Sequence, residues 1–135
     1  MSVTNIKEYL NNMLSGEVHS APESKEYFFE EGCFILEMLN VASDPDVSIA
    51  RARVEPGKTT RFHRLKGVTE RYVIQQGSGQ VYIGDQVAQT VQAGSVVVIP
   101  AGVRQKIHNS GSEMLVFLAI CSPRFTPDCY EDCDI

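Results

Sequence analysis

Two stretches of sequence decide the fold: residues 57–77, GKTTRFHRLKGVTERYVIQQG, and residues 94–109, GSVVVIPAGVRQKIHN. Both read as short strands that end at turn-forming residues. Glycine supplies the positive φ that tight turns need, and proline cannot continue a strand in the middle of a sheet. The residues predicted to fix the strand ends in this way are Gly57, Gly77, Gly94 and Pro100.

The same pattern extends through most of the chain. From Glu26 onward the hydrophobic period is two, interrupted every few residues by turn sequences. Ten strands are predicted, at residues 27–29, 33–39, 47–54, 59–65, 70–76, 80–83, 88–91, 95–99, 105–109 and 114–121. Many short strands with frequent turns indicate a sandwich or barrel rather than alternating β-α units. We therefore expect an all-β fold, a jelly-roll barrel.

The first residues show a different period. Between Asn5 and Ser15 the apolar side chains recur at helical spacing, which predicts one short amphipathic helix. Asn5 and Glu8 form the pattern of a capping box, and Gly16 ends the helix. The helix is expected to pack on the outside of the barrel or across a dimer partner. Its apolar positions are Ile6, Tyr9, Leu10, Met13 and Leu14.

These patterns divide the chain into a helix with its linker at residues 1–25, a barrel at 26–122 and a tail at 123–135. Pro123 and Pro127 flank Phe125 in the tail, which favours an extended, strand-free segment anchored by Phe125. A chain of 135 residues suits one domain, because two cores of half this length would each be marginal.

Composition narrows the function. The net charge is −5, which argues against nucleic acid as the main partner. No run approaches the roughly 20 apolar residues that span a membrane, and the first residues lack a secretory signal pattern. A reducing cytoplasm is expected, with Cys33 and Cys121 packed as small hydrophobes and Cys129 and Cys133 as free thiols. A group of basic residues forms either a solvated rim or an anion-attracting mouth: Arg61, Arg64, Lys66, Arg71, Arg104 and Lys106.

The two opening stretches resemble the motifs of the cupin superfamily, G-x5-H-x-H-x3-4-E-x6-G and G-x5-P-x-G-x2-H-x3-N. The structural positions match at the expected spacing: Gly57, Gly77, Gly94, Pro100, Gly102 and Asn109. The resemblance covers roughly residues 47–121 and implies a small single-domain cupin, a double-stranded β-helix with a pocket at one mouth. It lies closer to the small, one-barrel members that are often labelled as sugar-phosphate-isomerase-like, a label that rests on fold similarity.

The metal-binding positions of these motifs are degenerate. Metal-binding cupins hold one ion with three histidines and a glutamate; here His63 and Glu70 stand at two of these positions. Leu65 and Gln105 replace the other two histidines. The resemblance therefore implies at most one divalent ion, held by His63, Glu70 and Gln105. The alternative is that these polar groups bind one another or a small ligand directly, since an amide oxygen is a weak ligand and leucine is none.

Strand parity suggests which side chains share the pocket. Residues 61, 63 and 65 lie on one face of their predicted strand, and residues 70 and 72 lie on one face of theirs. We expect His63, Glu70 and Tyr72 as catalytic groups. The expected ligand-binding residues are Arg61, Leu65 and Gln105. His108 is an odd number of residues from Gln105, so it is expected on the opposite face.

Two functions are compatible with this set. One is an enzyme, with isomerase, lyase or dioxygenase-like chemistry, that acts on a small polar or anionic substrate by acid–base catalysis. The alternative is a non-catalytic module that binds or senses a small molecule. Cupin barrels commonly pair through their outer sheet faces, so a homodimer is expected in either case, without nucleic-acid or membrane partners.

Overall fold

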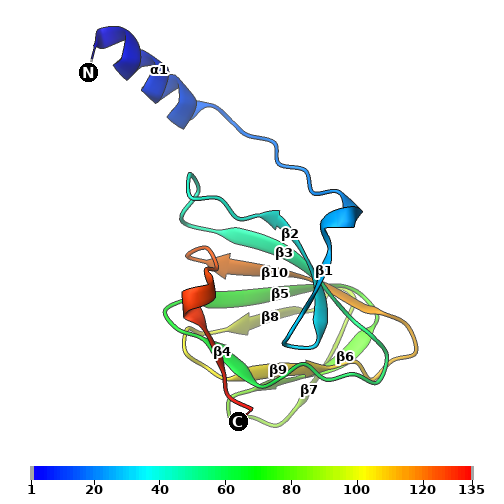
Figure 1. The fold of residues 1–135 in the computed structure, drawn as a ribbon. Helices are drawn as coiled ribbons and strands as arrows, with labels where there is room; N and C mark the ends of the chain where they lie inside the picture. The colour runs from blue at the N-terminus through cyan, green and yellow to red at the C-terminus, as the bar shows by residue number, and fades with distance from the viewer. Residues whose placement is uncertain (1, 135) are drawn as a thin grey trace.

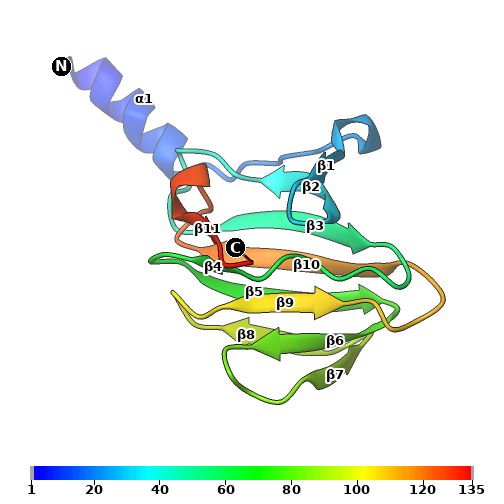
Figure 2. The same ribbon diagram turned by 60° about the horizontal axis from the view of Figure 1, so that its bottom comes forward.

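A computed structural model describes residues 2–134, apart from the side chains of residues 4 and 11–14. Two antiparallel sheets face each other and enclose a core (Figures 1 and 2). The larger sheet has six strands in the order β1 (Tyr27–Phe29), β2 (Cys33–Leu39), β3 (Ser48–Val54), β10 (Leu115–Ser122), β5 (Thr69–Gln76) and β8 (Val96–Ile99). The smaller has five, in the order β11 (Tyr130–Asp132), β4 (His63–Leu65), β9 (Gln105–His108), β6 (Ser78–Ile83) and β7 (Gln89–Gln92). The predicted all-β barrel is confirmed.

The core lies between the sheets because each strand turns alternate side chains inward. Tyr72 and Ile74 of β5 lie beside Phe117 of the neighbouring strand β10, and all three are almost fully buried. A second cluster contains Leu65, Val68, Cys121 and Cys129, and Tyr130 of the C-terminal tail packs against it. The expected packing of Cys33 and Cys121 is confirmed, and the four cysteines are free thiols.

The N-terminal helix, α1 (Val3–Leu14), begins earlier than predicted. Ser2 is its N-cap, because the Ser2 hydroxyl accepts a hydrogen bond from the backbone N–H of Asn5 at 3.2 Å. The predicted cap at Asn5 is therefore wrong, since Asn5 already lies in the first turn. None of the described helices is long and apolar enough to cross a membrane.

The helix projects away from the barrel at the end of an extended linker (Figure 1). Ile6, Tyr9 and Leu10 are exposed, so α1 does not pack on its own barrel. The alternative, that α1 packs across a dimer partner, stays a prediction. The predicted apolar side chains Met13 and Leu14 lie outside the described side chains. The linker ends in a short 3₁₀ turn, η1 (Glu23–Lys25), where Glu23 and Glu26 form ion pairs with Arg51 and Arg53 of β3.

The C-terminal tail is not strand-free, which corrects the sequence prediction. After a 3₁₀ turn, η2 (Pro127–Cys129), the tail forms β11 and pairs with β4, which places Asp132 opposite His63. The tail thereby covers the edge of β4, which would otherwise present unpaired backbone groups. Phe125 packs against the second cluster, and its N–H donates to Ser48 Oγ at 2.9 Å, as expected of an anchor.

Candidate functional site

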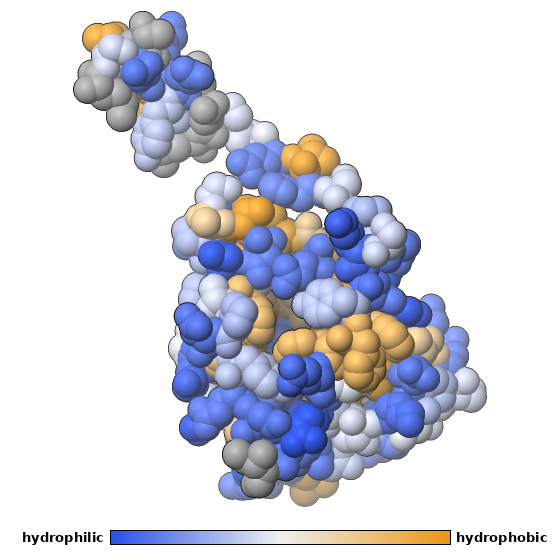
Figure 3. Space-filling view, in the orientation of Figure 1, coloured by the Kyte–Doolittle hydropathy of each residue, from blue (hydrophilic) through white to orange (hydrophobic). Residues whose placement is uncertain are grey.

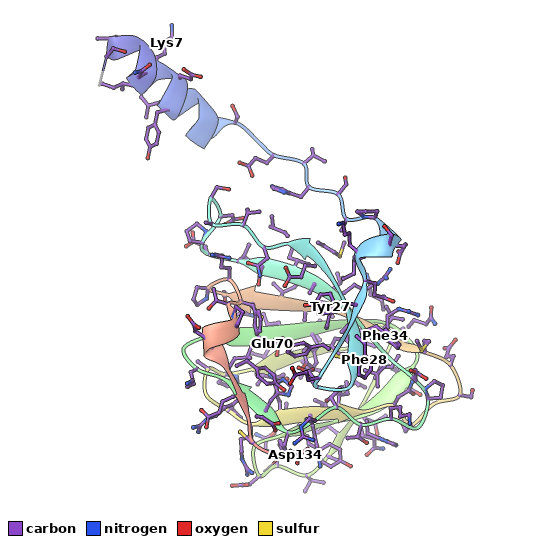
Figure 4. The ribbon with its side chains drawn as sticks, in the orientation of Figure 1. Lys7, Tyr27, Phe28, Phe34, Glu70 and Asp134 are labelled. Atoms are coloured by element: carbon purple, nitrogen blue, oxygen red, sulfur yellow. The ribbon has the colours of Figure 1, made fainter. Side chains whose placement is uncertain are left out.

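A cavity of about 70 Å³ opens at the mouth of the barrel. Its walls come from the β1–β2 hairpin, the inner faces of β3, β5 and β10, and the ring of Phe125. Most of the lining is apolar, and the acidic lining residues are Glu31, Glu37 and Glu70. Figure 4 shows Glu70 within the barrel and Tyr27 on β1, and both residues line the cavity. A concave, mostly apolar pocket with a few convergent polar groups has the character of a small-molecule site.

A hydrogen-bonded chain of three buried side chains crosses from one sheet to the other at this mouth. Tyr72 of β5 donates its hydroxyl proton to Gln105 Oε1, and Gln105 Nε2 of β9 donates to Glu70 Oε1 at 2.6 Å. Each of the three residues is at most 8% exposed. The alternation of β5 places Glu70 and Tyr72 on the same inner face, as parity predicted. The chain fixes both the position of the carboxyl group and the orientation of the amide.

Burial makes Glu70 a weaker acid than an ordinary glutamate. It raises the pKa of the carboxyl group to about 7, with a further rise from the nearby Glu31 carboxylate. His63 and the hydrogen bonds from Gln105 and Cys121 oppose the rise. Burial also raises the pKa of the Tyr72 phenol, so Tyr72 remains protonated and acts as the donor of the chain. Near neutral pH, Glu70 is therefore able both to accept and to release a proton.

Glu31 belongs to the site but was missed by the sequence prediction. It lies in the turn between β1 and β2, and its backbone carbonyl accepts a hydrogen bond from the Arg61 N–H at 2.7 Å, which fixes the turn against the barrel. Burial raises the pKa of the Glu31 carboxyl group to about 7. The local sequence Glu30-Glu31-Gly32 resembles an ordinary solvent-exposed turn, so no short-range pattern indicated this position.

His63 is next to Glu31 but does not line the cavity, and it is 2% exposed. Its Nδ1 is 2.8 Å from the carbonyl oxygen of Arg61. A carbonyl only accepts, so Nδ1 carries the proton. Nε2 is 3.6 Å from Glu31 Oε2, which is too long for a hydrogen bond. The ring of Tyr130 stacks on the imidazole, with 5.2 Å between the ring centroids. The tail strand β11 thus holds His63 in place, a contact that the sequence did not predict.

The structure places the other expected ligand-binding residues differently. Arg61 points away from the pocket, and its Nε donates to Asp132 at 2.8 Å. The inward prediction for Arg61 is wrong because residue 61 precedes β4, so strand parity does not apply to it. Leu65 faces inward, but it packs with Val68 and Cys121 and does not line the cavity. His108 bonds to Thr59 on the opposite face, as expected.

The arrangement offers little to a metal ion. Gln105 Oε1 already accepts from Tyr72, and Gln105 Nε2 points its protons at Glu70. Across residues 2–134, no group of three or more His, Cys, Asp or Glu residues could hold a metal. The residues His63, Glu70 and Gln105 as arranged therefore do not fit a metal ion, and the ion implied by the resemblance stays a prediction.

Comparison with known protein families places this barrel. Residues 50–121 match the description "Cupin domain". The chain belongs to the cupin family. No curated protein matches this cupin.

Solved structures agree on the fold. The nucleoside dehydratase Pac13, from Streptomyces, is similar with a TM-score of 0.72 and 16% identity, over 88% of this chain and 93% of Pac13. KdgF from Halomonas has a TM-score of 0.70 and 18% identity, over 84% of this chain and 98% of KdgF. A protein with a double-stranded β-helix domain from Klebsiella pneumoniae has a TM-score of 0.68 and 14% identity, over 82% of this chain and 91% of that protein. At these identities the similarity establishes the double-stranded β-helix fold. The function has to be argued from the residues of the pocket.

Proposed function

We propose that this cupin binds a small polar organic molecule at the barrel mouth and catalyses proton transfer on it, with Glu70 as the group that gives or takes the proton. The observation that carries the proposal is the buried Tyr72–Gln105–Glu70 chain, which ends on a carboxyl group that lines the cavity. A general acid or base works best when its pKa lies near the operating pH, and burial brings Glu70 to about 7.

The division of roles follows from the contacts. Glu70 reaches the cavity, whereas Gln105 and His63 are not among the residues that line it. Gln105 is therefore assigned a positioning role, and Tyr72 fixes the Gln105 amide from its other side. Arg61 was the cationic side chain expected to bind an anionic substrate, but it bonds to Asp132 outside the pocket. Isomerase or lyase chemistry on a neutral or cationic substrate suits this arrangement, and the name of the similar protein Pac13 describes a dehydratase.

Glu70→Gln tests the catalytic role. The first step is a thermal-stability screen of the full chain with sugars, nucleosides, amines and organic acids, followed by product analysis for each stabilising compound. Glu70→Gln is expected to lower turnover at least about 100-fold, the scale of a lost general acid or base, while a ligand at saturating concentration still stabilises the variant. Glu55→Gln, which changes an exposed carboxyl group outside the pocket, should behave as wild type. Normal turnover by Glu70→Gln would contradict the proposal, and a stabilising ligand that never yields product would favour the binding module.

We also propose a homodimer that pairs through the outer face of the larger sheet. Val96, Val73 and Leu118 are register partners across β8, β5 and β10, so they share one face. Val96 is 61% exposed, and Val98 beside it is 54% exposed. Val73 and Leu118 are half-buried, so the face presents an aliphatic row that is suited to a second copy of the same row.

Light scattering after size exclusion checks the dimer. A mass of about 30 kDa is expected, twice the 15.0 kDa of the chain. Val96→Lys should shift the protein to monomer, because it places a charge at the most exposed position of the row. Val87→Lys replaces a more exposed valine, between β6 and β7, and should leave the dimer intact. A 15 kDa species for the unaltered chain would rule out this interface.

A further inference from the structure

The charges around the mouth cavity have one sign. Glu31, Glu37 and Glu70 line it, and none of its described lining residues is Lys, Arg or His. The arginines near the mouth already have partners: Arg61 bonds to Asp132, and Arg124 donates at 2.9 Å to Oδ1 of Asn40, a residue that lines the cavity. The barrel therefore supplies no guanidinium or ammonium group to the carboxyl groups inside the pocket.

Glu31 is poorly satisfied among the described residues. Its side chain is 12% exposed, and its two polar side-chain contacts are both 3.6 Å long, one to the Cys33 thiol and one to His63 Nε2. The thiol is a weak donor, and the 3.6 Å between Nε2 and Glu31 Oε2 is too long for a hydrogen bond. A buried carboxyl group usually has strong donors. Those missing here are ones that a ligand in the pocket could supply.

Aromatic rings form the rest of the recognition surface. Tyr27, Phe29 and Phe125 line the outer part of the cavity, and Tyr72 and Phe117 pack together with 4.3 Å between ring centroids. Apolar residues also gather over the β1–β2 hairpin at the surface (Figure 3). Ring faces attract cations, and aromatic walls beside carboxylates are a recurring way to hold an organic ammonium group.

We propose that the pocket takes a small organic cation, an amine with an apolar body, whose ammonium group lies between Glu31 and Glu70. This rests on the proposed function, since it names the ligand class of the same pocket. An ammonium group offers three donors to two carboxyl groups, whereas an alcohol offers one. A carboxylate or phosphate would meet three acidic side chains and no cation. The cavity of about 70 Å³ suits a body of a few carbon atoms.

A matched series of probes tests the class. The full chain is titrated at pH 8 with n-butylamine, 1-butanol and sodium butyrate, and binding is followed by calorimetry and amide NMR shifts. The amine should bind at least tenfold more tightly than the alcohol, and butyrate should not bind in the pocket. Glu31→Gln and Glu70→Gln should each weaken amine binding at least tenfold, with NMR spectra that show an intact fold. Glu55→Gln should bind as the unaltered chain does.

Each other outcome overturns the amine class. Binding of the alcohol or butyrate as tight as that of the amine would do so while leaving the pocket as a binding site. Amine binding that Glu31→Gln does not weaken would place the ammonium group elsewhere. Binding of none of the three probes would also overturn the class, whereas the broader screen and the turnover of Glu70→Gln decide the proposed function independently.

Discussion

Replacing Glu31 with Gln is expected to stabilise the folded protein by about 3 kcal/mol at pH 8 and by about 1 kcal/mol or less at pH 5. Burial raises the pKa of Glu31 from 4.5 to about 7 in the folded state. Between these values the folded protein binds more protons than the unfolded chain, so stability falls as the pH rises through this window. Glutamine has nearly the same shape as the protonated acid but cannot ionise, so the variant avoids this loss.

Urea unfolding of both proteins from pH 5 to pH 8.5 measures the effect. The unaltered chain should lose stability along this range, and Glu31→Gln should lose less, because it also removes a carboxylate that raises the pKa of Glu70. Glu30→Gln changes the neighbouring exposed carboxyl group and should follow the unaltered chain. Equal stability of Glu31→Gln and the unaltered chain at pH 8 would show that Glu31 is not buried as an ionised group.

The loss of folding stability caused by Glu31 and Glu70 is itself informative about function. Two neighbouring carboxyl groups, both with a pKa raised to about 7, weaken the fold at neutral pH. Such an arrangement is retained where a site requires it, as is common for groups that bind or transfer protons. A bound cation would reverse the penalty by pairing with both groups. The same physical feature therefore links the pH dependence of folding to the proposed ligand class.

The sequence patterns correctly predicted which side chains face the interior where the strand is continuous. Glu70 and Tyr72 occupy one face of an eight-residue strand, and the structure places both inside the barrel. Parity failed at Arg61, because the chain is not a strand until His63 and its alternation begins there. The predicted strand at residues 59–65 was too long for a physical reason: Thr60 uses its N–H and its hydroxyl to bond to residue 107 without forming a regular ladder.

The contacts that complete the site depend on long-range packing, which local patterns do not encode. Glu31 enters the pocket because a turn folds against the backbone of residue 61, and Tyr130 reaches His63 because the tail pairs with β4. In the sequence, the first segment resembles a polar turn and the second a polar chain end. The motif spacing therefore identified the fold and part of the site, whereas the second carboxyl group and the stacked tyrosine required the tertiary structure.

Replacing Gly77 with Ala is expected to destabilise the fold by about 3 kcal/mol or more, from two additive causes. Gly77 has a φ of +84°, where an L residue costs about 1–2 kcal/mol. A methyl group there would also lie 2.7 Å from the carbonyl oxygen of Met114 and 3.1 Å from Cα of Leu115. These are backbone atoms at the start of β10, so no side chain can rotate away to make room.

Gly57→Ala separates the two causes. Gly57 has a similar φ of +77°, but an added methyl group meets no atom within 4 Å, so only the conformational cost of about 1–2 kcal/mol should appear. Urea unfolding of both variants at pH 6 gives the difference, which measures the steric part alone. Equal losses of stability in the two variants would contradict a close approach of β10 to the β5–β6 turn. If Gly77→Ala loses more, the cupin motif requires this glycine for its close packing against β10 as well as for its turn.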